Sequence, residues 1–235
     1  MIIQNIKKNY LIILLIIIIS IFLLKLSYND NFNESKDEIS NNNKEIKILS
    51  DGTKYTIHPD NLISGGVPKG GIGVDTGIPA LTKENINFVS IEEANKWIKD
   101  NELVLSIIHK GIERVYPLQI LVWHEIVNDN IGGDPILITY CPLCGSGIAY
   151  YRIINFNGEN KIVQFGTSGK LYNSNLIMYD DLTESYWQQI DGISIQGELT
   201  GQELKPIAID TVAWREWKIN HPNSEVLSKN TGFSR

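Results

Sequence analysis

The chain has 235 residues, of which 43% are hydrophobic and 20% are charged, and its formal net charge at pH 7 is −6. This length and composition are typical of an ordinary globular protein with one domain or at most two. The negative charge, and a sequence without a basic stripe interleaved with aromatic residues, argue against a nucleic-acid partner. The two cysteines are too few for a disulfide scaffold or for a four-cysteine zinc site.

The N-terminal segment has the pattern of a membrane anchor. Residues 1–9 form a short cytoplasmic tip that contains two lysines, and residues 10–26 are apolar except for Ser20 and Lys25. As a helix this run would cover roughly 25 Å, slightly less than the hydrocarbon core of a bilayer. The lysines before the run favour an N-terminus inside the cell. We therefore expect a single-pass transmembrane signal-anchor in the cell membrane, with the rest of the chain outside.

The alternative for this segment is a signal peptide that is cleaved, which would secrete the same domain. The residues after the run contain no small-x-small cleavage site and no cysteine for lipid attachment, so we prefer the uncleaved anchor. Residues 27–47 are rich in Asn, Ser, Asp, Glu and Lys, and we expect them to be a disordered linker. The extracytoplasmic domain then spans residues 48–235.

The first part of this domain contains a glycine-rich passage over residues 64–73. A phosphate loop would continue into Gly-Lys-Ser/Thr, which is not found here, so we interpret the passage as a surface loop and predict no nucleotide site. Ser90, with Glu93 three residues later, forms a capping box that predicts a short helix to about residue 100. Residues 103–108 and 113–118 predict a β-hairpin.

The strongest helical pattern in the domain covers residues 119–129. Ile120, Trp123, His124 and Val127 fall at helical spacing on one face, and the segment 128–133 ends the pattern. His124 is therefore expected to point inward, either as a buried, hydrogen-bonded histidine or as a metal ligand or base.

Both cysteines lie in the sequence Cys-Pro-Leu-Cys-Gly at residues 141–145, here called the CPLCG turn. The apolar run 136–140 leads into this turn, and residues 148–153 have the pattern of a strand after it. Pro142 fixes φ, and Gly145 tolerates a positive φ. The pattern predicts a strand–turn–strand unit in which both sulfurs point in the same direction.

The rest of the chain has the pattern of successive strands and one last helix. Because these strands follow one another without helices between them, we expect mostly antiparallel pairing. The predicted fold class is α+β, a mainly antiparallel, barrel-like β-sheet with a few flanking helices, preceded by the N-terminal transmembrane helix. The predicted segments are a hairpin over 148–156 and 161–165, strands over 176–179, 185–190, 193–198 and 225–227, and a helix over 211–220 capped by Asp210.

Several separate motifs resemble a widespread bacterial and archaeal family, the domain of unknown function 3179 (DUF3179). The resemblance runs from about Gly77 to the C-terminus and implies a secreted or membrane-anchored domain without an established activity. The family's pattern usually continues beyond residues 231–235, so we expect a final piece of the fold to be missing or supplied differently. The matching motifs are residues 123–129 (WHEIVND), 139–146 (TYCPLCGS), 165–176 (FGTSGKLYNSNL), 178–180 (MYD) and 183–187 (TESYW).

A soft-metal site is the first of three interpretations of the CPLCG turn. Covalent haem would require a histidine directly after the second cysteine, where Gly145 stands, so we expect no haem. The turn has the form of the knuckle found in zinc and iron sites, in which backbone amides point at the sulfurs. His124 is the predicted third ligand beside Cys141 and Cys144, and Met178 is a possible fourth. Such a ligand set favours copper, as Cu(I), or zinc.

The second interpretation is dithiol redox chemistry by Cys141 and Cys144. Thioredoxin-like sites place the dithiol at the start of a helix, whereas a strand is predicted here, so we rank redox below metal binding. The third interpretation is a structural disulfide, which would close a very small loop and remove little entropy from the unfolded chain. The first two imply a redox or metal-delivery partner, which the residues do not identify.

A different class of function is a small-molecule-binding protein or enzyme in which the Cys141–Cys144 pair is only structural. Its basis is a polar cluster amid aromatic residues, in which Glu184 would act as an acid or base if it were buried beside the CPLCG turn. We prefer the interpretation that these are loop residues that hydrogen-bond the backbone of turns. The cluster comprises Ser168, Tyr172, Asn173, Ser174, Asn175, Asp180, Asp181 and Glu184.

Overall fold

The computed structural model describes residue 20, residues 45–71 and residues 77–233. By its internal contacts the chain separates into Met1–Glu45 and Ile46–Arg235, and the second unit contains the fold described here. Apart from residue 20, the predicted anchor over residues 10–26 lies outside the described residues, as does most of the predicted linker. Within the described residues, no helix is long and apolar enough to cross a membrane.

The described strands form four sheets, of seven, five, four and two strands. The order in the seven-stranded sheet is β1 (Lys47–Ile48), β2 (Lys54–Tyr55), β15 (Ser194–Gln196), β14 (Tyr186–Gln188), β13 (Asn175–Asp180), β12 (Phe165–Tyr172) and β3 (Ile63–Ser64). In the five-stranded sheet it is β17 (Asp210–Ala213), β5 (Leu103–His109), β6 (Ile112–Pro117), β18 (Glu225–Leu227) and β4 (Phe88–Val89). The four-stranded sheet has β16 (Pro206–Ile207), β9 (Ser146–Tyr151), β8 (Asp134–Cys141) and β7 (Ile126–Ile131), and β10 (Ile153–Phe156) pairs with β11 (Glu159–Ile162).

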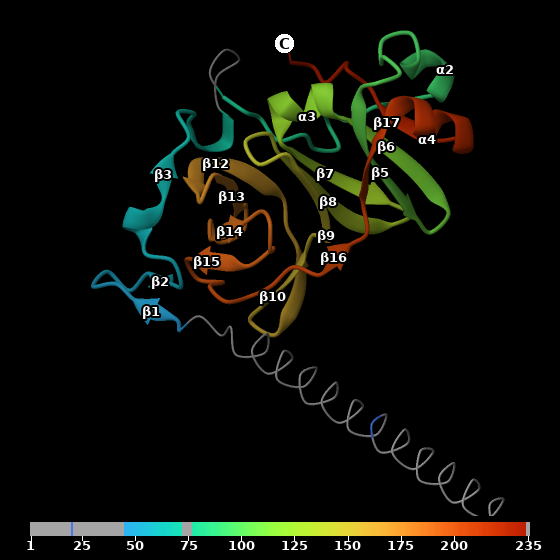
Figure 1. Cartoon of the computed structure of the whole chain (residues 1–235). Helices are drawn as coiled ribbons and strands as arrows, with labels where there is room; N and C mark the ends of the chain where they lie inside the picture. Colours follow the sequence, from blue (N-terminus) through green and yellow to red (C-terminus); the bar gives the residue numbers. More distant parts are fainter. Residues whose placement is uncertain (1–19, 21–44, 72–76, 234–235) are drawn as a thin grey trace, which may run out of the picture. The chain divides into compact units, whose positions relative to one another are not determined.

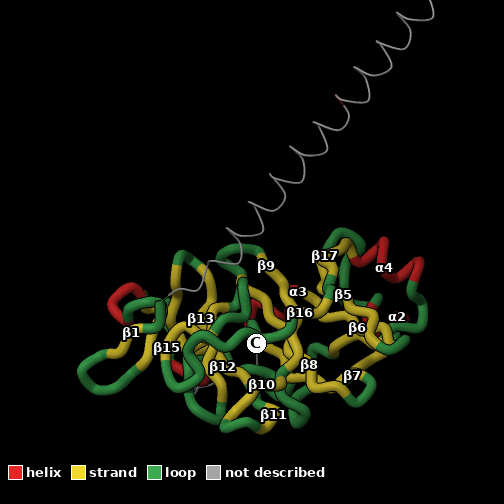
Figure 2. The backbone as a smooth tube through the Cα atoms, turned by 90° about the horizontal axis from the view of Figure 1, so that it is seen from below, coloured by secondary structure: helices red, strands yellow, loops and turns green. Residues whose placement is uncertain are grey.

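The helices among the described residues are short. They are the α-helices α2 (Ile91–Ala94), α3 (Leu118–His124) and α4 (Trp214–Asn220), with two 3₁₀ turns, η1 (Pro59–Asn61) and η2 (Lys69–Gly71). Figures 1 and 2 both show the four-stranded sheet between the other two large sheets, with α2 and α4 at the outer end of the five-stranded sheet. The pairing is antiparallel throughout these sheets except between β18 and β6, which confirms the predicted antiparallel α+β architecture. The sheet that was predicted to be barrel-like is a single curled sheet that forms half of a barrel.

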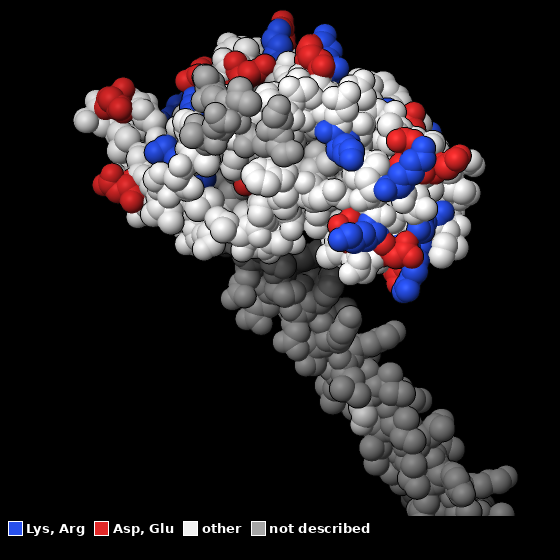
Figure 3. All heavy atoms as spheres, turned by 90° about the horizontal axis from the view of Figure 1, so that it is seen from above, with Lys and Arg blue, Asp and Glu red and all other residues white. Residues whose placement is uncertain are grey.

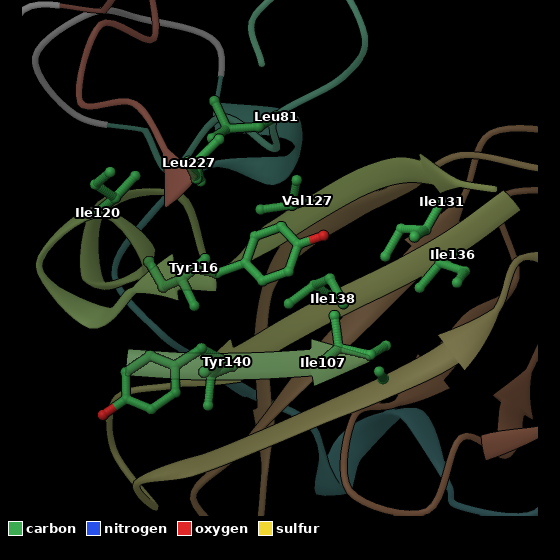
Figure 4. Close-up of a cluster of buried hydrophobic side chains, with 13 residues drawn as sticks. Leu81, Ile107, Tyr116, Ile120, Val127, Ile131, Ile136, Ile138, Tyr140 and Leu227 are labelled. Carbon is green, nitrogen blue, oxygen red and sulfur yellow. The ribbon is translucent and has the colours of Figure 1, made fainter. Parts of the chain in front are cut away.

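Strand β8 is buried on both of its faces because it lies between two hydrophobic cores. Ile136 and Ile138 belong to a core shared with β5, β6 and β7, whereas Leu137 and Cys141 belong to a core shared with β12, β13 and β14. Figure 4 shows the first of these cores, with Ile138 beside Tyr116 and Ile136 beside Ile131. Successive side chains of a strand point to opposite faces, so an unbroken apolar run is what a strand between two cores requires.

A buried ion pair joins the five-stranded sheet to the four-stranded sheet. Asp129 on β7 is 2% exposed and accepts hydrogen bonds from Arg114 Nη1 at 2.6 Å and from the Tyr116 hydroxyl at 2.5 Å, both on β6. Arg114 Nε also donates to Glu225 on β18 at 2.8 Å. The Asp129 carboxylate and the Arg114 guanidinium are therefore both paired, as burial of a carboxylate requires.

On the face of the molecule shown in Figure 3, acidic and basic side chains lie next to one another.

Two of the predicted helices are partly wrong, because strand pairing overrides the helical pattern at one end of each. The prediction over residues 119–129 fails after His124, where α3 ends and residues 126–131 pair with β8 as β7. The prediction over 211–220 fails at its start, since β17 pairs with β5 and α4 begins only at Trp214. Helical and strand patterns of short apolar runs are hard to separate from the sequence alone.

The predicted cap of the first helix, the predicted β5–β6 hairpin and the predicted last strand are confirmed, whereas the predicted length of that helix is wrong. Ser90 Oγ accepts a hydrogen bond from the backbone N–H of Glu93 at 3.2 Å and caps α2, although this helix ends at Ala94 rather than near residue 100. The predicted hairpin is formed by β5 and β6, and the predicted last strand is β18.

Candidate functional site

The CPLCG turn connects β8 to β9 at the end of the four-stranded sheet. Cys141 and Ser146 are opposite each other in the ladder, and Gly145 between them has φ +63°, a value that most side chains avoid. The predicted strand–turn–strand unit is therefore confirmed. Cys141 is 1% exposed, whereas Cys144 is exposed at the surface, and both are free thiols.

Cys141 lies in the core with donors and acceptors close to its sulfur. Its thiol donates to the carbonyl oxygen of Ser174 at 3.6 Å, and the backbones of Cys144 and Leu176 act to lower its pKa. Burial, together with the hydrogen bond to Cys144, raises the pKa of the Cys141 thiol to about 11. Cys141 is therefore a protonated thiol at neutral pH.

Cys144 has the opposite electrostatic environment. Asn175 Nδ2 is 3.4 Å from the Cys144 sulfur, and Ser146 Oγ is 3.0 Å from it. Partial burial raises the pKa of this thiol, but hydrogen bonds from Cys141, Ser146 and Asn175 outweigh it and leave the pKa below the usual value. A lowered pKa on an exposed thiol is the property that makes a cysteine nucleophilic.

Gln189 holds these donors in place from the interior. Its side chain is fully buried, and Oε1 accepts hydrogen bonds from Asn175 Nδ2 at 2.7 Å and from Ser146 Oγ at 3.0 Å. Nε2 of Gln189 donates to Thr139 Oγ1 at 3.0 Å, which fixes the direction of the amide. The Asn175 amide has two hydrogens and can serve Gln189 and Cys144 together.

The Ser146 hydroxyl has one hydrogen and two possible acceptors. With Cys144 protonated, the thiol can donate to Ser146, which in turn donates to Gln189 Oε1. When Cys144 is a thiolate, the hydroxyl has to turn its hydrogen toward the sulfur. Ser146 can therefore follow the protonation of Cys144 by rotating a single bond.

His124 does not lie with the cysteines. Its Nδ1 is 2.8 Å from the carbonyl oxygen of Pro79, and its Nε2 is 3.3 Å from Thr231 Oγ1. The prediction that it points inward is confirmed, since it is 2% exposed, but the structure does not place it as a ligand beside Cys141. Met178 is fully buried in the same core as Cys141. Within the described residues, no group of three or more His, Cys, Asp or Glu side chains is arranged to hold a metal ion.

Glu184 lacks the burial that the acid–base prediction required. Its side chain is 73% exposed, and it forms an ion pair with Lys69 at 3.1 Å. Other members of the polar cluster hydrogen-bond nearby backbone, as the preferred interpretation expected. Ser168 Oγ donates to the carbonyl of Ile177, and Asp180 accepts from the backbone of Thr183. Asn175 also accepts from the backbone N–H of Ile190, but it differs from the others because its side-chain nitrogen contacts the sulfur of Cys144.

A family model described as a protein of unknown function, DUF3179, matches residues 75–235. The chain belongs to the DUF3179 family. The match includes the CPLCG turn and Asn175, Gln189 and Ser146, so the whole hydrogen-bonded group around Cys144 lies in the DUF3179 domain. The comparisons with curated proteins and with solved structures gave no match.

Sequence reasoning missed two residues near the turn of this DUF3179 domain. Gln189 follows β14 without any motif of its own, so only the fold reveals its contact with Ser146 and Asn175. Glu125 was assigned to the interior of a helix, whereas it ends α3 in a left-handed conformation. A polar residue directly after an apolar helical run was the available signal for Glu125.

Proposed function

We propose that this DUF3179 domain carries out thiol–disulfide exchange, with Cys144 as the attacking thiol and Cys141 as the resolving thiol. The observation that supports this proposal is the asymmetry of the pair. Cys144 is exposed and has several hydrogen-bond donors at its sulfur, whereas Cys141 is buried beside it with a raised pKa. An exposed thiolate and a protected neighbouring thiol are the two components that exchange through a mixed disulfide requires.

The proposed reaction has two steps. The Cys144 thiolate attacks one sulfur of a partner disulfide, a new S–S bond forms, and the other partner sulfur leaves as a thiolate. Cys141 then loses its proton and attacks the Cys144 sulfur, which releases the second partner thiolate and leaves the Cys141–Cys144 disulfide. The domain is oxidised by two electrons and the partner is reduced, and the reverse sequence would oxidise a partner dithiol.

We therefore rank dithiol redox chemistry above metal binding, whereas the sequence alone favoured metal binding. A metal site needs further ligands beside Cys141 and Cys144, and His124 binds Pro79 and Thr231 instead. The hairpin position of the turn, which counted against a dithiol, is compensated by side-chain donors. Asn175 and Ser146 supply the stabilisation of a thiolate that a helix N-terminus would otherwise provide.

We also propose that residues 10–26 anchor the domain outside the cell membrane, where disulfide chemistry is common. This rests on the apolar sequence between Lys7 and Lys25. The test is fractionation of cells that express the full chain, followed by protease treatment of intact spheroplasts. Membrane-bound protein that is digested from outside is expected. Protein that remains in the soluble cytoplasmic fraction would contradict the anchor.

The exchange proposal is tested with the purified full-length chain, oxidised glutathione and mass spectrometry. The Cys141→Ser variant should retain one glutathione per chain on Cys144, and the Cys144→Ser variant should retain none. The unmodified chain should proceed to the internal disulfide, which glutathione reduces without unfolding. Two results would overturn the proposal: about one equivalent of tightly bound copper or zinc with unreactive thiols, or a disulfide that is reduced only after the protein unfolds.

A further inference from the structure

A cavity with a volume of about 210 Å³ lies between α3 and the segment that follows β18. Its described lining residues include Trp123 and His124 from α3, and Lys229, Thr231 and Phe233 from the later segment. The pockets that hold drug-sized ligands have roughly 300–1,000 Å³, so this cavity has room for a smaller molecule with a single substituted ring. The proposed thiol–disulfide exchange makes no use of these residues.

His124 and Thr231 supply buried polar groups to this cavity, since they are only 2% and 3% exposed. The carbonyl oxygen of Pro79 lies 2.8 Å from His124 Nδ1, and because a carbonyl only accepts, this nitrogen carries the hydrogen. In the neutral imidazole Nε2 is then an acceptor, and the Thr231 hydroxyl 3.3 Å away donates to it. The Thr231 oxygen keeps its lone pairs, so it can accept a hydrogen from a bound molecule.

Two aromatic side chains give the cavity flat apolar walls. Trp123 is 50% exposed although it is large and apolar. The Phe233 ring lies with its centroid 5.4 Å from that of His124 and is tilted by 54° to it. Aromatic rings pack favourably on one another in offset or edge-to-face arrangements, so these walls suit a ligand that is itself aromatic.

Lys229 gives the cavity a positive charge. It is the charged side chain among the described lining residues, apart from the titratable His124, and it is exposed at the surface. Its ammonium lies 5.7 Å from the centroid of the Trp97 ring, within the range of a cation–π contact. The backbone N–H of Thr231 donates to the carbonyl of Lys229 at 3.1 Å, so the cation and the hydroxyl belong to one tight turn.

We propose that this cavity binds a phenolic acid, which is an aromatic ring that carries a carboxylate and a hydroxyl group. The ring lies against Trp123 and Phe233, and the carboxylate pairs with the Lys229 ammonium. The phenolic hydroxyl donates to Thr231 Oγ1, which needs a donor because its own hydrogen points at His124. This binding site is separate from the proposed exchange reaction and does not depend on it.

The experiment titrates 3-hydroxybenzoate and 4-hydroxybenzoate into the full-length chain in detergent and measures binding by calorimetry, with the heat from detergent alone subtracted. At least one of the two should bind with a Kd below about 1 mM. Benzoate lacks the hydroxyl and should bind about three- to tenfold more weakly, the effect of one lost hydrogen bond. In Thr231→Val this preference for the hydroxyl should disappear, because the acceptor is gone.

Lys229→Gln should weaken binding of the phenolic acid about three- to tenfold. Lys205→Gln is the matched control, because Lys205 is also exposed and its ammonium lies 5.3 Å from the centroid of an aromatic ring, that of Tyr151. It removes the same charge outside the cavity and should leave the affinity unchanged.

Three results would overturn the inference. They are no binding of either phenolic acid, equal losses in Lys229→Gln and Lys205→Gln, and equal affinity of the unmodified chain for benzoate and the phenolic acids. If Thr231→Val does not fold, the comparison with benzoate in the unmodified chain and the two lysine variants decide. None of these results bears on the cysteines, so the exchange reaction stands or falls by its own test.

Discussion

The side-chain amide nitrogen of Asn175 lies 3.4 Å from the sulfur of Cys144. The same nitrogen donates to Gln189 Oε1 at 2.7 Å, and Asn175 Oδ1 accepts from the backbone N–H of Ile190 at 3.1 Å. Both ends of the amide are therefore engaged, so its orientation is set by the hydrogen bonds around it. A fixed donor stabilises a thiolate without having to be ordered when the charge forms.

Asn175→Asp should therefore raise the pKa of Cys144 and slow its reaction with disulfides at neutral pH. The substitution keeps an oxygen for the Ile190 N–H but replaces the donor at the sulfur with a carboxylate, which repels a thiolate. We expect a loss of about tenfold or more in the rate of this reaction, from roughly 1.4 kcal/mol per pKa unit. The pKa is measured from the ultraviolet absorbance of the thiolate as a function of pH.

Asn173→Asp is the control for this prediction. Asn173 lies two residues away in the turn between β12 and β13, is exposed, and undergoes the same chemical change. Its φ of 49° is a left-handed value that Asp tolerates. Equal shifts of the Cys144 pKa in both variants would mean that the added charge alone, and not the lost hydrogen bond, is responsible.

The two thiols should react with iodoacetamide at different pH values. Cys144 should be alkylated first, at a rate that rises with pH through its lowered pKa and then levels off. Cys141 should remain unmodified until the pH approaches about 11 or until the protein unfolds, because it is buried and its pKa is raised to that value. Peptide mapping by mass spectrometry measures each site. Equal labelling of both cysteines at pH 7 would contradict the assigned roles.

Glu125→Gln should stabilise the fold above neutral pH. The pKa of Glu125 is raised from 4.5 to about 7, so between these values the folded chain holds a proton that the unfolded chain has lost. The free energy of unfolding therefore decreases as the pH rises through this window. At roughly 1.4 kcal/mol per pKa unit, the variant gains up to about 3 kcal/mol at pH 8 and close to nothing at pH 4.

Urea unfolding of the full-length chain at both pH values measures this difference, with Glu184→Gln as the exposed control. A gain of the same size at pH 4 and pH 8 would show that the side chain acts through packing and not through its charge.

Asp129→Ala should be strongly destabilising. It leaves Arg114, whose side chain is 13% exposed, without its closest carboxylate and removes the acceptor of the Tyr116 hydroxyl. Loss of one partner of a buried ion pair costs about 3–5 kcal/mol. Glu225→Ala is the matched control, because Glu225 binds the same guanidinium but its side chain is 49% exposed, and a loss of about 0–1 kcal/mol is expected. Chemical unfolding compares them, and similar losses for both variants would contradict the role of burial.

The sequence was sufficient to predict the parts of the fold that depend on neighbouring residues. The capping of α2 by Ser90 and the CPLCG hairpin follow from local conformational preferences, and both are present. The helical pattern of residues 119–129 failed after His124, because Val127 and Asn128 pair with β8 on one side and with Leu81, far back in the sequence, on the other. Helix propensity is a weak preference, and pairing with other strands overrides it.

The candidate site divides in the same way. The two cysteines and their shared turn could be predicted from the sequence. The difference in burial between them could not, since the burial of Cys141 depends on packing against β12 and β13. Gln189 approaches Cys144 only because β14 lies beside β13, and His124 turns toward Thr231 near the end of the described chain. None of these contacts produces a periodicity or a motif spacing that could be recognised in the sequence.

The alternation of β8 between two cores has a consequence for insertions and deletions. Adding one residue to β8 ahead of Cys141 would exchange its two faces, because the side-chain period of a strand is two. Ile138 would then face the core that now contains Leu137, and the sulfur of Cys141 would turn away from the carbonyl of Ser174 toward the opposite core. The length of this strand is therefore restricted by the site and by both cores together.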